Sequence, residues 1–198
     1  IPRSRLFLSM QDEIGDASAR LSPLIARRAA GEPLQYVLGA WDFYGREFLL
    51  SPDTLIPRPE TEGLVERAVA ALRRSPRTRP LALDVGTGSG AIAVTLAAEV
   101  PAAGVLATDI SPGALRKARE NAARHGVAAR VLPICCDLLS ALKCGGRFVV
   151  VVSNPPYVAE GEWPLLPPEV RDHEPPEALL AGREGLSVLR PLVAGAAR

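Results

Sequence analysis

The sequence predicts an α/β protein built on a doubly wound parallel sheet. From Leu81 onward, short apolar segments alternate with segments of helical periodicity, and residues 86–90 form a glycine-rich turn after the first apolar segment. A third observation is the run of four valines at 149–152, because a strand that is apolar on both faces is typical of a sheet covered by helices on both sides. Alternating strands and helices joined by right-handed crossovers give this architecture.

The part of the chain before Leu81 predicts helices and a hairpin. Residues 1–31 show a helical pattern that ends at Gly31, and residues 35–50 are aromatic and β-branched, which favours a β-hairpin bent at Gly39 and Gly45. Pro59 suits the first position of a helix that continues to about residue 74. We therefore expect three parts: a partial helical domain at 1–34, a hairpin linker at 35–56 and an α/β domain at 57–198.

The α/β part resolves into four expected strands, at 81–85, 105–110, 131–136 and 148–153. Helices are expected at 91–99 and 112–125, and a last helix at 185–198. Ser111 is a plausible N-cap, followed by Pro112 at the first helical position.

Composition excludes several classes of protein. The chain has 198 residues and a net charge of +1, so it does not favour non-specific nucleic-acid binding through released counterions. No apolar run approaches the roughly 20 residues of a membrane-spanning helix. Cys135, Cys136 and Cys144 form no CxxC pair, so we expect buried, reduced thiols in a cytoplasmic protein and no metal site.

The first motif of chemical interest is the glycine-rich turn Asp84-Val85-Gly86-Thr87-Gly88-Ser89-Gly90 between a strand and a helix. Glycines there permit positive φ and close approach of a ligand to the backbone. Asp109 ends the next strand, where a carboxylate can accept hydrogen bonds from both hydroxyls of a ribose. Both features fit a nucleotide-containing cofactor, but NAD enzymes use a similar turn.

The second motif, Asn154-Pro155-Pro156-Tyr157, directly follows the fourth expected strand. Two prolines cannot extend a ladder, so the chain must turn out at the carboxyl edge of the sheet, where open α/β sheets bind ligands. The Asn154 side-chain oxygen, fixed backbone carbonyls and the Tyr157 ring can grip a planar –NH2 group and leave its nitrogen free to attack. NAD enzymes have no need for this element.

Taken together, these motifs resemble those of S-adenosylmethionine-dependent methyltransferases that modify planar nitrogens. The segments 31–39, 43–45 and 56–62, and the residues from Pro168 to Leu179, are similar to the HemK/PrmC family. The resemblance covers nearly the whole chain. It implies a Rossmann-like methyltransferase domain, and N5-methylation of the glutamine in the Gly-Gly-Gln loop of class I peptide chain release factors.

The resemblance also implies roles for individual residues. Asn154, Pro155 and Tyr157 are the expected catalytic residues, with Tyr157 as a wall rather than an acid, and together with Pro156 they are expected to bind the substrate amide. Arg58 and Glu60 are weaker candidates, since a helix cap with solvated charges explains them equally well. The expected contacts of S-adenosyl-L-methionine are Gly86, Thr87, Gly88, Ser89, Gly90, Asp109, Asp137, Leu138 and Asn154.

Two other functions share these motifs. A nucleic-acid amino-methyltransferase would be expected to carry a basic face, whereas residues 158–198 hold four basic and seven acidic residues; we expect no direct nucleic-acid partner. A non-catalytic relative is disfavoured by the intact motifs. Only four of the family's seven strands are expected here, so the resemblance implies a chain truncated at its C-terminus, from a bacterial cytoplasm or an organellar relative.

Overall fold

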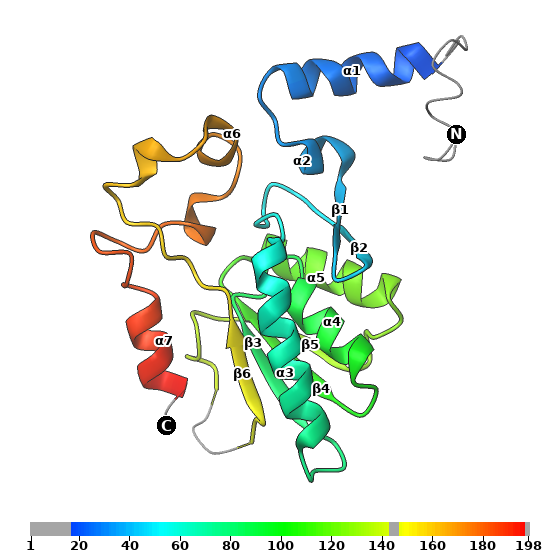
Figure 1. The fold of residues 1–198 in the computed structure, drawn as a ribbon, viewed down its shortest axis with the longest axis vertical. Coiled ribbons are helices and arrows are strands. Elements are labelled where there is room, and N and C mark those ends of the chain that lie inside the picture. Colours follow the sequence, from blue (N-terminus) through cyan, green and yellow to red (C-terminus); the bar gives the residue numbers. More distant parts are fainter. Residues whose placement is uncertain (1–16, 143–146, 197–198) are drawn as a thin grey trace.

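A computed structural model describes residues 17–142 and 147–196 (Figure 1). Its centre is a four-stranded parallel sheet formed by β3 (Leu81–Val85), β4 (Gly104–Asp109), β5 (Val131–Cys135) and β6 (Val150–Ser153), in the order β5-β4-β3-β6. The chain moves outward from β3 to β4 and β5, then returns to the other side of β3 to form β6. This reversal is the signature of a doubly wound sheet and confirms the predicted fold class.

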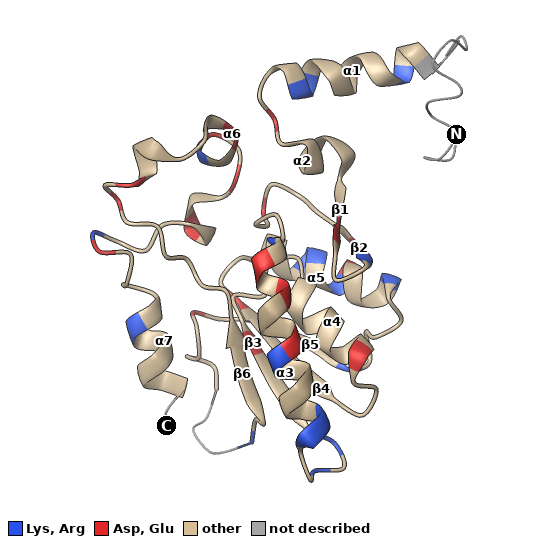
Figure 2. Cartoon of the chain, viewed as in Figure 1, with Lys and Arg blue, Asp and Glu red and all other residues tan. Residues whose placement is uncertain are grey.

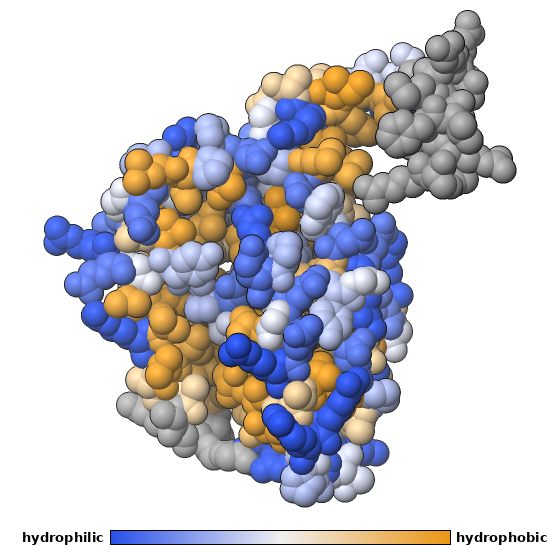
Figure 3. Space-filling view, in the orientation of Figure 1, coloured by the Kyte–Doolittle hydropathy of each residue, from blue (hydrophilic) through white to orange (hydrophobic). Residues whose placement is uncertain are grey.

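Three helices cover one face of the sheet: α3 (Glu62–Arg74), α4 (Ala91–Glu99) and α5 (Pro112–Arg124) (Figure 1). Residues 91–97 of α4 are all buried, because α3, α5 and the sheet surround this helix. On the other face, α7 (Leu189–Ala196) packs Leu192 against Leu83 and Val85. Apolar surface gathers on the side formed by α7 and the segment after β6, where Leu165 and Val193 are exposed (Figure 3).

The N-terminal part differs from the expected pattern. The helix α1 (Ala17–Ala29) lies within the expected segment, whose first sixteen residues are outside the described part of the chain. Residues 35–38 were expected in a hairpin but belong to a short helix, α2 (Leu34–Leu38), and the hairpin is confined to β1 (Ala40–Phe43) and β2 (Arg46–Leu49). Pro33 precedes this helix and Gly39 ends it in a left-handed conformation, while burial of Tyr36 and Val37 overrides their β-propensity.

Two further expectations need correction. The last helix begins at Leu189 rather than at Gly185, because Gly185 lies in a left-handed turn against the backbone of Tyr157. Cys135 is exposed and Cys136 half-buried, so these thiols are not core residues, and Cys144 lies outside the described residues. The exposure of Cys135 follows from its place at the end of the sheet's edge strand.

Between β6 and α7 lie only short helices: η3 (Trp163–Leu165), α6 (Pro168–Arg171) and η4 (Pro176–Ala178). The segment turns back on itself, since Val158 N–H donates to the Leu179 carbonyl and Ala181 N–H to the Val158 carbonyl. Acidic residues outnumber basic ones along it (Figure 2). Within the described residues, no helix has the length and apolar character needed to span a bilayer.

Candidate active site

The strand register brings the sequence motifs to one edge of the sheet. Val85 of β3 pairs with Thr108 of β4 and with Ser153 of β6. The residues that follow these three, Gly86, Asp109 and Asn154, therefore lie at the same level of the sheet edge, where Asp109 is the last residue of β4. They line one cavity of about 910 Å³ at the carboxyl ends of the strands, which is where the motifs predicted a ligand site.

Most of the expected cofactor residues line this cavity. The exception among them is Gly90, whose added Cβ would lie 3.1 Å from the Cα of Ala118 in α5. All three glycines have positive φ, but a side chain at Gly90 would also be tight against α5, whereas Gly86 and Gly88 have open space where a Cβ would stand. The expected residues that line the cavity are Gly86, Thr87, Gly88, Ser89, Asp109, Asp137, Leu138 and Asn154.

Asp84 caps the start of α4. Its Oδ2 accepts hydrogen bonds from Thr87 Oγ1 at 2.6 Å and from Ala93 N–H at 3.1 Å. The carboxylate is fully buried, and burial raises its pKa to about 7 although both hydrogen bonds act in the opposite direction. A protein carboxylate thus occupies the helix N-terminus, the place where dinucleotide-binding folds receive a pyrophosphate.

Asp109 shapes the glycine-rich turn. One carboxylate oxygen accepts Gly88 N–H at 2.8 Å and the other accepts Ser111 N–H at 2.9 Å. Burial raises the pKa of Asp109, and these backbone N–H groups partly offset that effect. Ile110 N–H is a third backbone donor, and because the two carboxylate oxygens together offer about four acceptor directions, Asp109 keeps capacity for a further donor from the cavity.

The turn is also held from behind by Asn121, a fully buried residue of α5 that the sequence did not single out. Asn121 Nδ2 donates to the carbonyls of Ser89 and Leu49, at 2.8 and 2.9 Å, and Oδ1 accepts Leu49 N–H at 2.8 Å. One side chain therefore joins the glycine-rich turn to the hairpin. Nothing in the sequence pattern of this helix indicates that Asn121 joins the turn to the hairpin, because its hydrogen-bond partners lie far away along the chain.

Asn154 stands at the boundary between two cavities. It lines the large cavity and also a second cavity of about 300 Å³, and Leu55 and Ala178 are likewise shared by both. Asn154 Nδ2 donates to Thr61 Oγ1 at 3.3 Å, and no described residue donates to Asn154 Oδ1. The side-chain oxygen is therefore the part of Asn154 left to accept a hydrogen bond from a ligand.

The residues after Asn154 divide between the two cavities. Pro155 and Tyr157 line the second cavity, whereas Pro156 lines the large one. The Tyr157 side chain is exposed, and Tyr157 N–H donates to the Leu179 carbonyl at 3.1 Å. The two prolines thus direct the chain along the wall that separates the cavities.

Of the two weaker candidates, the structure brings Arg58 to the site and not Glu60. Arg58 lines the second cavity and forms an ion pair with Glu174, whereas Glu60 is exposed and lines neither cavity. Glu60 is therefore a residue of the helix start, in η2 (Pro59–Thr61). Thr61, next to it, is the residue that contacts Asn154.

Most of the titratable residues in the wall of the large cavity are carboxylates. Besides Arg171, His173 and Cys136, the titratable residues that line it are Asp53, Asp109, Asp137, Asp172, Glu174 and Glu177. Glu174, Asp53 and Asp172 form ion pairs with Arg58, Arg116 and Arg171. The remaining carboxylates, Asp109, Asp137 and Glu177, favour a ligand that carries positive charge over one that carries a pyrophosphate.

Comparison with known proteins identifies the family. Residues 67–165 match the methyltransferase small domain, and residues 1–39 match the PrmC N-terminal domain. The chain is 49% identical over 192 residues to the release factor glutamine methyltransferase of Koribacter versatilis, covering 96% of this chain and 67% of that protein. The chain belongs to the release factor glutamine methyltransferase family.

Other relatives agree with this assignment. The release factor glutamine methyltransferase of Nitratidesulfovibrio vulgaris is 48% identical over 89% of this chain and 59% of its own length. That of Cereibacter sphaeroides is 46% identical over 99% of this chain and 68% of its own length. The chain therefore spans about three fifths to two thirds of the length of these curated relatives.

Solved structures confirm the fold at greater distance. The catalytic domain of hMettl16, in complex with an RNA hairpin, superposes with a TM-score of 0.59 at 14% identity, covering 89% of this chain and 73% of that one. A SAM-dependent methyltransferase from Agrobacterium tumefaciens gives 0.50 at 21% identity, over 73% of this chain and 52% of that one. These superpositions support a methyltransferase fold for this protein.

Proposed function

We propose that this protein transfers a methyl group from S-adenosyl-L-methionine to the side-chain amide nitrogen of the glutamine in a Gly-Gly-Gln loop of class I release factors, in a bacterial cytoplasm. The observation that carries the proposal is the position of Asn154, with its oxygen free to accept a hydrogen bond between a cofactor-sized cavity and a smaller one.

The large cavity suits S-adenosylmethionine. This cofactor carries a positive sulfonium and a positive ammonium group beside one carboxylate, and the cavity wall is rich in carboxylates. Space at Gly86 and Gly88 admits a ligand against the backbone, and Asp109 keeps acceptor capacity for ribose hydroxyls. Asp84 at the start of α4 disfavours the alternative of a dinucleotide, whose pyrophosphate would lie there.

Positioning accounts for the chemistry of the proposed reaction. An amide nitrogen is a poor nucleophile, because its lone pair is delocalised into the carbonyl. Asn154 Oδ1 and the Pro155 carbonyl would each accept one N–H of the glutamine amide, which orients it and increases the electron density on nitrogen. Bound S-adenosylmethionine supplies an electrophilic methyl group. Methyl transfer would form the C–N bond as the C–S bond breaks, with the neutral thioether of the demethylated cofactor as leaving group, and the amide would lose one proton. Asn154 would act as a hydrogen-bond acceptor and not as a base.

One incubation tests the proposal. The protein is mixed with S-adenosylmethionine labelled in its methyl group and, in separate reactions, a class I release factor, the same factor with the loop Gln replaced by Ala, and double-stranded DNA or RNA. We expect label only in the release factor with the unchanged loop, and its loop peptide should gain the mass of one methyl group. Label in nucleic acid would favour the amino-methyltransferase alternative, and label in the Ala variant would refute the assigned target.

A further inference from the structure

An ion pair between a half-buried arginine and a buried glutamate lies in the walls of the two cavities. Arg58 Nη2 is 2.5 Å from Glu174 Oε1, and Glu174 Oε2 accepts Ile56 N–H at 3.2 Å. The Glu174 side chain is 1% exposed and that of Arg58 is 32% exposed. Glu174 lines the large cavity and Arg58 the second one, so the pair spans the partition on which Asn154 lies.

The second cavity is the route by which a substrate amide can reach Asn154. The large cavity would be filled by the cofactor, and the second cavity meets it at Leu55, Asn154 and Ala178. Its wall is otherwise largely apolar, and Arg58 is its one charged residue among those described. This step rests on the proposed function.

A free guanidinium in that wall would favour the wrong substrate. Arginine binds carboxylates through two parallel hydrogen bonds, so an unpaired Arg58 would attract a glutamate side chain in place of glutamine. Glu174 removes this attraction because its carboxylate neutralises Arg58. One oxygen is paired with Arg58 and the other accepts Ile56 N–H, so the buried Glu174 side chain is held beside the guanidinium. The carboxylate that pairs with Arg58 is thus supplied by the protein and not by the substrate.

We propose that Glu174 is a specificity-determining residue: by neutralising Arg58 in the wall of the second cavity, it makes the site select an uncharged amide over a carboxylate. Asn154 contributes by offering an oxygen that repels a carboxylate at the reacting position. Glu174 extends this selection of an amide over a carboxylate to the second cavity, through which the substrate side chain enters.

The test compares Glu174→Gln with the unchanged protein. The substrate is a release factor with its Gly-Gly-Gln loop, and the inhibitor is the same factor carrying Glu in place of that Gln. Glutamine keeps the volume of Glu174 and an oxygen for Ile56 N–H, but it frees the charge of Arg58. We expect the inhibition constant of the Glu factor to fall by about tenfold or more, as for one added charge pair near a protein surface, while KM for the Gln factor changes much less.

Two further variants isolate the cause. In the double variant Arg58→Gln with Glu174→Gln no charge remains, so the inhibition constant should return to that of the unchanged protein. Glu169→Gln is the matched control, because Glu169 forms an ion pair with Arg28 at 2.9 Å on the same segment but lines neither cavity. It should leave the constant unchanged.

The proposal has distinct ways to fail. An unaltered inhibition constant in folded Glu174→Gln would overturn it, as would an equal fall in the double variant. If Glu174→Gln does not fold, Glu174→Asp keeps a carboxylate but shortens its reach to Arg58, and it should lower the constant in the same direction by less. Absence of any methyl transfer by the unchanged protein would instead count against the proposed function.

Discussion

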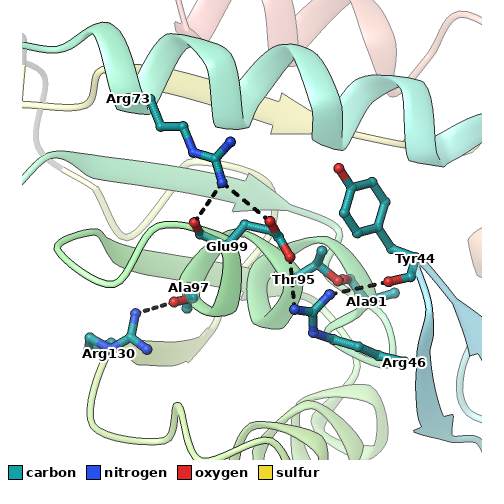
Figure 4. Close-up of polar contacts among 8 residues, drawn as sticks. All are labelled: Tyr44, Arg46, Arg73, Ala91, Thr95, Ala97, Glu99 and Arg130. Atoms are coloured by element: carbon teal, nitrogen blue, oxygen red, sulfur yellow. Dashed lines mark hydrogen bonds and ion pairs between the residues drawn. The ribbon is translucent and has the colours of Figure 1, made fainter.

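The carboxylates at the two ends of α4 are held in opposite ways. At the start of the helix, Asp84 is fully buried and hydrogen-bonded to a hydroxyl and a backbone N–H, and no cation among the described residues forms an ion pair with it. At the other end, Glu99 lies between Arg46, at 2.8 Å, and Arg73, at 3.3 Å (Figure 4). The carboxyl terminus of a helix disfavours a negative charge, so these arginines compensate Glu99 both for the helix dipole and for its partial burial.

This difference between the two ends of α4 distinguishes the candidate active site from the part of the protein that only stabilises the fold. Around Asp84 and Asp109 the hydrogen-bond donors are backbone and hydroxyl groups, which are fixed in place, and of the two carboxylates it is Asp109 that lines the large cavity. Around Glu99 the charge is neutralised by long side chains from the hairpin and from α3, and Arg130 also donates to the Ala97 carbonyl (Figure 4). We expect substitutions at the first end to alter ligand binding and pH dependence, and those at the second to alter stability slightly.

The largest effect on activity is expected from substitution of Asn154, at the carboxyl edge of the sheet. Asn154→Ala removes the proposed acceptor for the substrate amide, and kcat should fall about a hundred- to a thousandfold, as when one positioned polar group is removed from an active site. The dissociation constant of the cofactor, measured by calorimetry, should change little.

Ser153→Ala provides the matched control for Asn154. The hydroxyl of this neighbour donates to the Val85 carbonyl at 2.7 Å and lines neither cavity. Its turnover should stay close to that of the unchanged protein. Equal losses of turnover and cofactor affinity in Asn154→Ala would contradict the assigned role.

A second prediction concerns Asp109. Asp109→Asn keeps one oxygen for the glycine-rich turn but loses the charge and one acceptor, so the cofactor should bind about ten- to a hundredfold more weakly, which corresponds to a lost hydrogen bond to a charged group. Asp109→Ala should weaken binding further, because it also releases the N–H groups of Gly88 and Ser111. Titration calorimetry with S-adenosylmethionine measures both, and an unchanged affinity would exclude Asp109 from the cofactor site.

Much of this site was predictable from the sequence, because its parts are local. Gly86 and Asn154 each follow an apolar strand directly and Asp109 ends one, and parallel strands place their carboxyl ends at one edge. The same reasoning predicted the sheet strands to within a few residues. It also assigned Gly90 to the cofactor, whereas the close approach of Ala118 to this glycine depends on tertiary packing.

The parts that sequence reasoning missed depend on distant contacts. Asn121 joins residues 72 and 32 positions away, and Arg58 meets Glu174 across 116 positions. The helix α2 was mistaken for a strand, since Tyr36 and Val37 have β-propensity but are buried within a single helical turn. Which polar side chain finds which partner is decided by the fold and not by spacing along the chain.

The third prediction uses the pKa of Asp84. Its pKa in the folded protein is about 7, above the ordinary value of 3.8, so the folded state holds the proton more tightly than the unfolded state. Stability from this group is therefore present below about pH 4 and is lost as the pH rises towards 7, by a few kcal/mol at most.

Asp84→Asn should remove that dependence. Asparagine keeps an oxygen for Thr87 and Ala93 but does not ionise, so the cofactor-free variant should match the unchanged protein near pH 4 and exceed it at pH 8. Urea unfolding at a series of pH values measures the difference. Parallel stability curves for the two proteins between pH 4 and 8 would show that Asp84 does not titrate in this range.

The smallest effect is expected at the far end of α4. Glu99→Gln loses two charge pairs, but Arg73 is 59% exposed and Arg46 and Glu99 are about a quarter exposed, so solvent screens them and the free energy of unfolding should fall by no more than about 1 kcal/mol. The loss should shrink in high salt, and the cofactor dissociation constant should not change. Urea unfolding at two salt concentrations tests this. A loss several times larger, insensitive to salt, would mean that Glu99 behaves as a buried charge like Asp84, and the contrast between the two ends of α4 would then be wrong.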